Sequence, residues 1–251
     1  MIQSLSTRMY SWLRVQIRVG LPSLHLPAVI ALAGFASACG LTAFERPQSL
    51  TVSSAELSSH DLIAYRELSI DDFLATTPPP VVARHPSRFW AYSCLQLRPR
   101  ADAPLTITLL DDGSAAPRYS ATPKDLHYLA YFDRDCSWWN HAVTQPLTYI
   151  LQHEQIHFLI TELEARRLNR RVAEIASATT SVAATPQAAA AATRLQLRQV
   201  MQAAVREVDL QHLAFDKDAS NGEHAELQQR WWRRLSVELE TDDRGLSKIS
   251  E

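Results

Sequence analysis

The pattern of hydrophobic and polar positions changes near the middle of the chain. Between residues 60 and 140, short aromatic and β-branched runs alternate with turn-forming residues, a pattern typical of strands. From residue 144, apolar residues recur with the 3.6-residue period of a helix. We therefore predict three or four strands in the first part. In the second part we predict three helices, at about 146–175, 188–213 and 223–239.

The first long helix has a clear start and end in the sequence. Thr144 is a suitable N-cap, and Pro146 fits the first turn, where its missing N–H costs nothing. Residues 176–187 interrupt the helical pattern around Pro186, and we expect them to form a turn or loop between two antiparallel helices. One stripe of the helix is apolar and comprises Leu147, Ile150, Leu151, Phe158, Ala165 and Leu168.

The N-terminal residues have the features of an export signal. Three arginines and no acidic residue precede a ten-residue apolar run, residues 26–35. This run is too short to span a membrane, because a spanning helix needs about 20 apolar residues. Small residues at 36–38 precede Cys39, as at the site where bacterial lipoproteins are cleaved and acylated. We expect lipidation at Cys39 and an outer-membrane lipoprotein that faces the periplasm. Secretion with an unmodified Cys39 is the alternative.

These features divide the chain into four predicted segments, of which the last two form one domain over about residues 65–240. The segments are a signal peptide at 1–38, a tether at 39–64, a β-rich part at 65–143 and a helical part at 144–251.

The composition fits a folded domain and argues against several functions. The 251 residues are 46% apolar, and 25 Lys and Arg stand against 27 Asp and Glu, giving a formal net charge of −2. This balance lacks the basic footprint of nucleic-acid binding, so we expect no nucleic-acid partner. The sequence also contains no glycine-rich phosphate-binding motif.

The two cysteines of the β-rich part, Cys94 and Cys136, agree with export. In an oxidising compartment they can form a disulfide. Closing a loop of about 40 residues stabilises the fold by about 3–4 kcal/mol through chain entropy. Two separate buried thiols are the alternative.

The chemistry-bearing motif is HEQIH, from His153 to His157, which matches the zinc-binding pattern HExxH. Two histidines four residues apart project from the same face of a helix, about 6 Å apart along its axis. At that separation, their ring nitrogens can bind one Zn²⁺. Glu154 lies beside them, where a carboxylate can take a proton from water at the metal. The motif therefore favours a zinc site over two structural histidines.

A third protein ligand must come from outside the motif. The helix continues past the motif without a break, so Glu162 points away and Glu164 lies about 10 Å further along the axis. Residues 215–224 lie at the junction of two predicted helices and can fold back over the motif. Asp216 and His224 are the leading candidates there, and the sequence does not choose between them.

The motif and its surroundings resemble a bacterial family of predicted secreted zinc-dependent proteases, a domain of unknown function with the hallmark HEQxHFxIxExxARxL. Residues 153–168 are similar to this hallmark. Weaker likenesses follow the family's order over about residues 65–240. They are residues 68–73 to an LTWxDF opening, Phe132 and 137–138 to an aromatic SW segment, 215–222 to YDxETxHG, and 228–231 to QxxW.

Two positions depart from the family pattern. Ala219 and Asn221 stand where the pattern has Thr and His, and an amide is a poor zinc ligand. If that histidine is the third ligand, Asp216 or His224 must replace it, or the site is left with two histidines. The resemblance and the predicted elements together indicate an α+β fold. In it, a small N-terminal β-rich layer packs against a helical, zincin-like domain with HExxH on a long helix.

The functional expectation is a zinc-dependent metallopeptidase of the bacterial cell envelope. His153 and His157 would hold Zn²⁺ with Asp216 or His224, and Glu154 would be the general base. The partners would be a peptide or protein substrate and a membrane, the latter through the lipid anchor. A non-catalytic envelope lipoprotein that acts as a binding or structural module is the runner-up. A hydrolase of a non-peptide amide, such as cell-wall material, is a third alternative.

Overall fold

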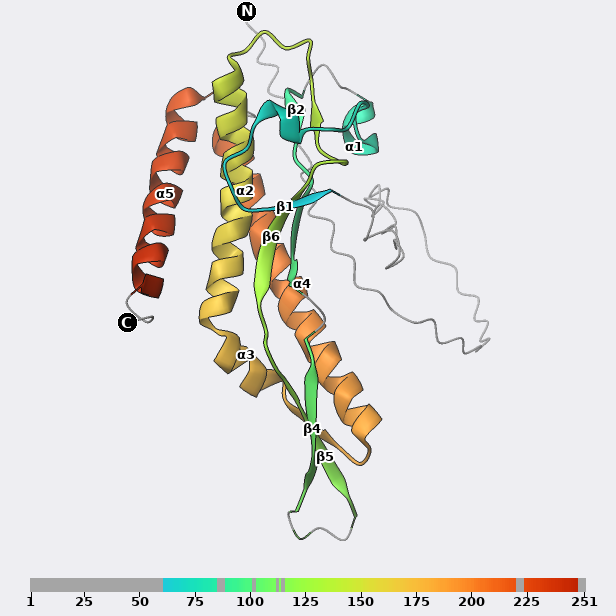
Figure 1. Ribbon diagram of the computed structural model, residues 1–251. Coiled ribbons are helices and arrows are strands. Elements are labelled where there is room, and N and C mark those ends of the chain that lie inside the picture. Colours follow the sequence, from blue (N-terminus) through green and yellow to red (C-terminus); the bar gives the residue numbers. More distant parts are fainter. Residues whose placement is uncertain are drawn as a thin grey trace, which may run out of the picture. The chain divides into compact units, whose positions relative to one another are not determined.

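A computed structural model describes residues 61–84, 89–100, 103–111, 113, 116–219 and 224–247 (Figure 1). This part combines small antiparallel sheets with helices and is therefore an α+β fold. Cys39, the predicted signal peptide and residues 39–60 of the tether lie outside the described residues, as does Asn221. Within the described ranges, no helix is long and apolar enough to cross a membrane.

The strands form three small antiparallel sheets among the described residues, and seven of the eight strands come before residue 140. The strand count is thus higher than the three or four predicted, because several strands have only two or three residues. The first sheet contains β1 (Leu62–Ala64), β6 (Tyr128–Asp133) and β3 (Leu95–Pro99), with β6 in the centre. The second pairs β2 (Ala91–Tyr92) with β7 (Trp138–Trp139). The third contains β4 (Leu105–Leu110), β5 (Arg118–Pro123) and β8 (Ser181–Ala183).

Two short helical turns lie between β1 and β2, and four longer helices come after β7, with β8 between the second and third of them. The short ones are η2 (Ile70–Asp72) and α1 (Pro80–Ala83), and the longer ones are α2 (Leu147–Arg170), α3 (Val172–Thr179), α4 (Pro186–Ala219) and α5 (Ala225–Ser247). The single predicted helix at 146–175 is therefore two helices, which meet at Arg171. The predicted loop at 176–187 holds the end of α3 and strand β8. Pro186 starts α4, at a position where proline is well tolerated.

Helix α2 lies at the centre of the hydrophobic core. Its residues 153–161 are all buried, because β6 and β3 pack on one side while α4 and α5 pack on the others (Figure 1). Phe158 faces the sheet, where its ring lies 5.8 Å from Phe132 and 5.1 Å from Tyr65. Leu147, which the apolar stripe included, is 52% exposed because it lies in the first turn, ahead of these contacts.

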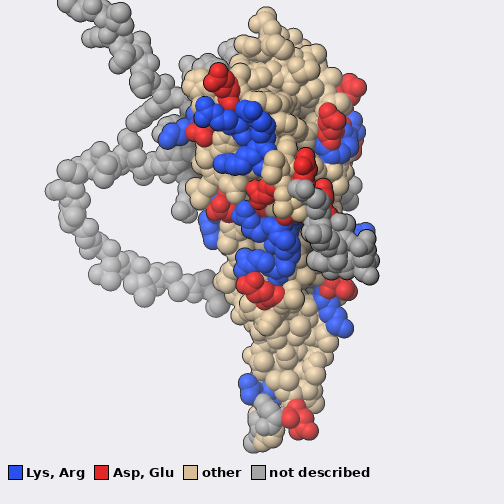
Figure 2. All heavy atoms as spheres, turned by 90° about the vertical axis from the view of Figure 1, so that its left-hand side faces the viewer, with Lys and Arg blue, Asp and Glu red and all other residues tan. Residues whose placement is uncertain are grey.

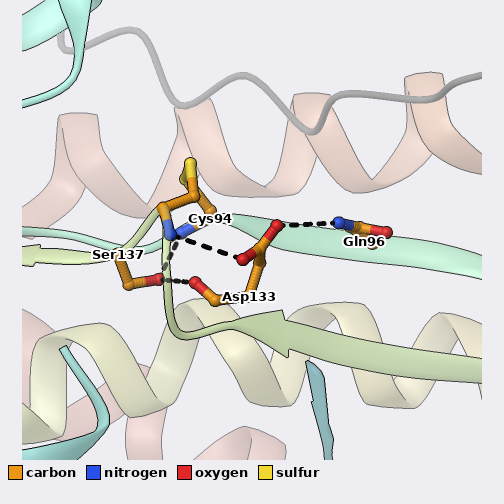
Figure 3. The surroundings of a disulfide bond; sticks show 5 residues. Cys94, Gln96, Asp133 and Ser137 are labelled. Atoms are coloured by element: carbon orange, nitrogen blue, oxygen red, sulfur yellow. Dashed lines mark hydrogen bonds between the residues drawn. A yellow bond between two sulfur atoms is a disulfide. The ribbon is translucent and has the colours of Figure 1, made fainter. Parts of the chain in front are cut away.

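The structure contains a disulfide between Cys94 and Cys136, whose Cα atoms are 5.7 Å apart. Figure 3 shows the hydrogen bonds that surround it. The backbone N–H of Cys94 donates to Ser137 Oγ at 3.0 Å, and Ser137 Oγ donates to the carbonyl of Asp133 at 2.7 Å. Gln96 Nε2 donates to Asp133 Oδ2 at 3.2 Å. The turn between β2 and β3 is thereby held against the end of β6.

Charged side chains of both signs cover the face that carries α5 (Figure 2). Part of this mixture joins α5 to α2, because Arg166 of α2 pairs with Asp243 of α5 and Arg170 of α2 pairs with Asp242 of α5. Exposed pairs of this kind contribute at most about 1 kcal/mol each. The face presents no field of a single sign, in line with the near-zero net charge.

Candidate metal centre

Three buried side chains from two helices converge at one point. His153 and His157 lie one turn apart on α2, and Asp216 comes from α4, which packs against α2. The two Nε2 atoms are 3.3 Å apart, and Asp216 Oδ1 lies 3.4 Å from His153 Nε2 and 3.1 Å from His157 Nε2. The three residues are 7%, 0% and 6% exposed. Their donor atoms form a group that could hold a metal ion.

The orientation of His153 is fixed by an amide on α5. Gln228 donates from Nε2 to the carbonyl of Tyr149 at 3.0 Å and to Gln152 Oε1 at 3.2 Å. Its Oε1 therefore faces His153 Nδ1, 3.1 Å away. An amide oxygen can only accept a hydrogen bond, so the proton lies on His153 Nδ1. In the neutral ring this leaves a lone pair on Nε2, the atom that faces Asp216.

The other histidine of the motif has a second histidine as its partner. His157 Nδ1 lies 2.8 Å from Nδ1 of His212, which comes from α4 and is fully buried. His212 Nε2 in turn lies 3.4 Å from Thr161 Oγ1, and this hydroxyl donates to the carbonyl of His157 at 3.2 Å. Both ring nitrogens of His212 therefore have partners on α2.

The electrostatics of the group follow from burial and mutual contact. Burial alone raises the pKa of Asp216, but the nearby charge of His157 and the close contacts with both histidine rings outweigh it and hold that pKa far below its ordinary value. Burial alone lowers the pKa of His153, but the contact with the Asp216 carboxylate and the charge of Glu154 raise it overall. Burial and the charge of His157 bring the pKa of His212 well below normal. The surroundings thus keep the Asp216 carboxylate negatively charged and favour a positive charge beside it.

Glu154 is buried next to the group and has a hydroxyl partner. Ser93 Oγ donates to Glu154 Oε2 at 2.5 Å, and Ser93 is itself buried. Ser93 follows β2 and directly precedes Cys94, so the disulfide and its hydrogen bonds lie next to the residue that holds the carboxylate. Ser93 is thus a positioning residue for Glu154.

An aromatic layer covers one side of the histidines. The ring of Phe215 lies 4.6 Å from that of His153 and 4.9 Å from that of His157, with Trp231 5.5 Å behind it. Trp231 Nε1 donates to Asp218 Oδ2 at 3.0 Å. This layer keeps the surroundings of the group apolar, which strengthens electrostatic interactions within it.

The structure separates the candidate ligands that the sequence left open. Asp216 lies in the group with His153 and His157, whereas His224 lies outside it. His224 is exposed, and its Nδ1 lies 3.2 Å from the carbonyl of Asp218. Glu162 and Glu164 also lie outside the group and pair with arginines of α2.

Three residues around the group were not found as site residues from the sequence: Ser93, His212 and the amide of Gln228. Gln228 entered only through the QxxW likeness, without a role. His212 had a local signal, because it precedes Asp216 by four residues and shares its helix face. That signal was hidden by a predicted helix end at 213, whereas α4 continues to Ala219. Ser93 gave no signal, since its contact with Glu154 spans 61 residues.

Searches of protein-family models, curated proteins and solved structures found no match to this chain.

Proposed function

We propose that this protein is a zinc-dependent metallopeptidase in which His153, His157 and Asp216 hold the metal. The observation that carries the proposal is the triangle of ligand atoms, with sides of 3.1, 3.3 and 3.4 Å. Tetrahedral zinc has ligands at 2.0–2.2 Å, which puts neighbouring ligand atoms about 3.3–3.6 Å apart. The observed spacing, in the apolar core of the fold, is close to these values, so His153, His157 and Asp216 would hold one zinc ion as its protein ligands.

The type of ligand atom narrows the choice of metal. Two imidazoles and one carboxylate suit zinc and other first-row transition metals, whereas calcium takes six to eight oxygen ligands at longer distances. The hydrogen bonds behind the ligands support the same reading, because the partner of His153 puts the ring proton on Nδ1 and leaves Nε2 free to bind.

Each residue then has a chemical role. Zinc supplies Lewis acidity, which lowers the pKa of water to about 7 and polarises a carbonyl group. Glu154, oriented by Ser93, accepts the proton of the attacking water and returns it to the leaving amine. Asp216 supplies the negative charge that two neutral imidazoles lack, and the ring of Phe215 excludes water from one side of the ligands.

The cellular setting belongs to the proposal as well. The export signal and Cys39 support a lipoprotein of the cell envelope, anchored in the outer membrane by its lipid and acting on peptides or proteins. The HEQxHF hallmark in residues 153–158 supports a relationship to the predicted secreted zinc-dependent proteases.

Removing and restoring the metal tests the peptidase proposal. We expect the zinc-loaded protein to hydrolyse fluorescein-labelled casein, to lose this activity with 1,10-phenanthroline and to regain it when zinc is added. Hydrolysis that survives complete removal of the metal would contradict the proposal. If the zinc-loaded protein cleaves neither casein nor a library of unstructured peptides, the non-catalytic binding module becomes the better interpretation.

A further inference from the structure

His212 occupies a place on α4 where an apolar residue would be expected. It is fully buried, and the α4 residues one turn away on the same side, Val208 and Phe215, are apolar and also fully buried. A polar ring at such a position costs free energy unless it is hydrogen-bonded. Both of its nitrogens have partners, and both partners, His157 and Thr161, belong to α2.

The direction of each hydrogen bond follows from the Thr161 hydroxyl, the last group in this series of hydrogen bonds. A backbone carbonyl can only accept, and the carbonyl of His157, at 3.2 Å, is closer to Thr161 Oγ1 than His212 Nε2 is, at 3.4 Å. We therefore place the single hydroxyl hydrogen on the bond to that carbonyl, which leaves Thr161 Oγ1 to accept from His212. His212 must then carry its proton on Nε2, which leaves a lone pair on Nδ1. The short contact between the two Nδ1 atoms therefore requires the proton on His157 Nδ1.

From this series of hydrogen bonds we infer that His212 is a positioning residue for the metal centre. It accepts the Nδ1–H of His157 and so presents the Nε2 lone pair of His157 to the metal. The inference rests on the proposed zinc site and adds a role for a residue that binds neither metal nor substrate. It makes the i, i+4 pair His212 and Asp216 a unit of α4, in which one residue ligates and the other orients a ligand. Outer partners of ligating histidines change metal affinity by about 10–100-fold.

Two replacements at this position separate the hydrogen bond from the packing. His212→Leu keeps an apolar side chain of similar size but has no acceptor for His157. His212→Gln supplies an amide oxygen for His157 and an amide N–H for Thr161. We expect the zinc Kd of the full-length chain, measured by competition with a chromophoric chelator, to rise about 10–100-fold in the Leu variant. The Gln variant should stay within about threefold of wild type, by the same principle of a retained partner.

The outcomes distinguish the role of His212 from the existence of the zinc site itself. Zinc binding by wild type with unchanged affinity in His212→Leu would overturn the role of His212 and leave the metal site intact. A low affinity in both variants at equal folded content, checked by circular dichroism, would also overturn it, because the acceptor would then not be what matters. Failure of wild type itself to bind zinc would instead overturn the proposed function.

A measurement on the wild-type protein covers the case in which His212→Leu does not fold. Nitrogen-15 NMR of the zinc-loaded chain reports the protonated ring nitrogen of each histidine. We expect the proton of His157 on Nδ1 and that of His212 on Nε2. A proton on Nδ1 of His212 would reverse the hydrogen bond and overturn the inference.

Discussion

Replacing Asp216 with alanine is expected to weaken zinc binding by about a hundredfold to a thousandfold. Structural zinc sites gain about 10–16 kcal/mol from the metal, or about 2.5–4 kcal/mol for each of four ligands. Each 1.4 kcal/mol is a factor of about ten in Kd. Asp216 Oδ1 lies within 3.4 Å of both Nε2 atoms, so its loss removes one of three protein ligands. Zinc titration against a competing chelator measures the effect.

Two matched variants make this experiment decide the third ligand. His224→Ala removes the other candidate, which lies outside the group, and Glu207→Ala removes an exposed carboxylate elsewhere on α4. Both should bind zinc as wild type does. Loss of binding in His224→Ala with normal binding in Asp216→Ala would reverse the assignment.

Replacing Glu154 with glutamine is expected to reduce casein hydrolysis by about 10²–10⁴-fold while zinc binding stays unchanged. Glutamine keeps the size of the side chain and can still bond to Ser93, but it cannot accept a proton from water. The expected signature is therefore a loss of kcat in a protein that still contains its metal. Initial rates and zinc content are measured on the same samples.

Glu162→Gln is the matched control for this variant. It makes the same chemical change on the same helix, two turns further on, where the carboxylate pairs with Arg166. It should retain wild-type activity. Equal activity of Glu154→Gln and wild type would refute the general-base role, even if the metal site itself were established.

The sequence predicted the type of most elements, because their signals are local. The 3.6-residue period from residue 144 gave the helices, and the aromatic or apolar runs at 87–97, 104–110 and 126–132 gave strands. What it missed depends on contacts between distant residues. Strand β8 has three residues and exists because it pairs with β5, about sixty positions earlier. The break between α2 and α3 at Arg171 also has no signal in the apolar period.

The residues of the candidate site also differ in whether their signal in the sequence is local. His153, Glu154 and His157 follow from one short motif, because helix geometry fixes their relative positions. Asp216 remained one of two candidates, since choosing it requires knowing that α4 continues past residue 213 and packs on α2. Ser93, His212 and Gln228 come from three separate elements that reach α2 only through tertiary packing. The hydrophobic period and the spacing of a motif therefore identify ligands that lie on one helix, but they do not identify the residues from other elements that orient those ligands.

The zinc content of the full-length chain, purified without chelators and measured by elemental mass spectrometry, tests the central claim most directly. We expect about one zinc per chain in wild type and in Glu154→Ala, because both retain the three residues that would hold the metal. We expect almost none in His157→Ala. Absence of zinc from the wild-type protein, even after incubation with the metal, would contradict the account, as would full zinc occupancy in His157→Ala.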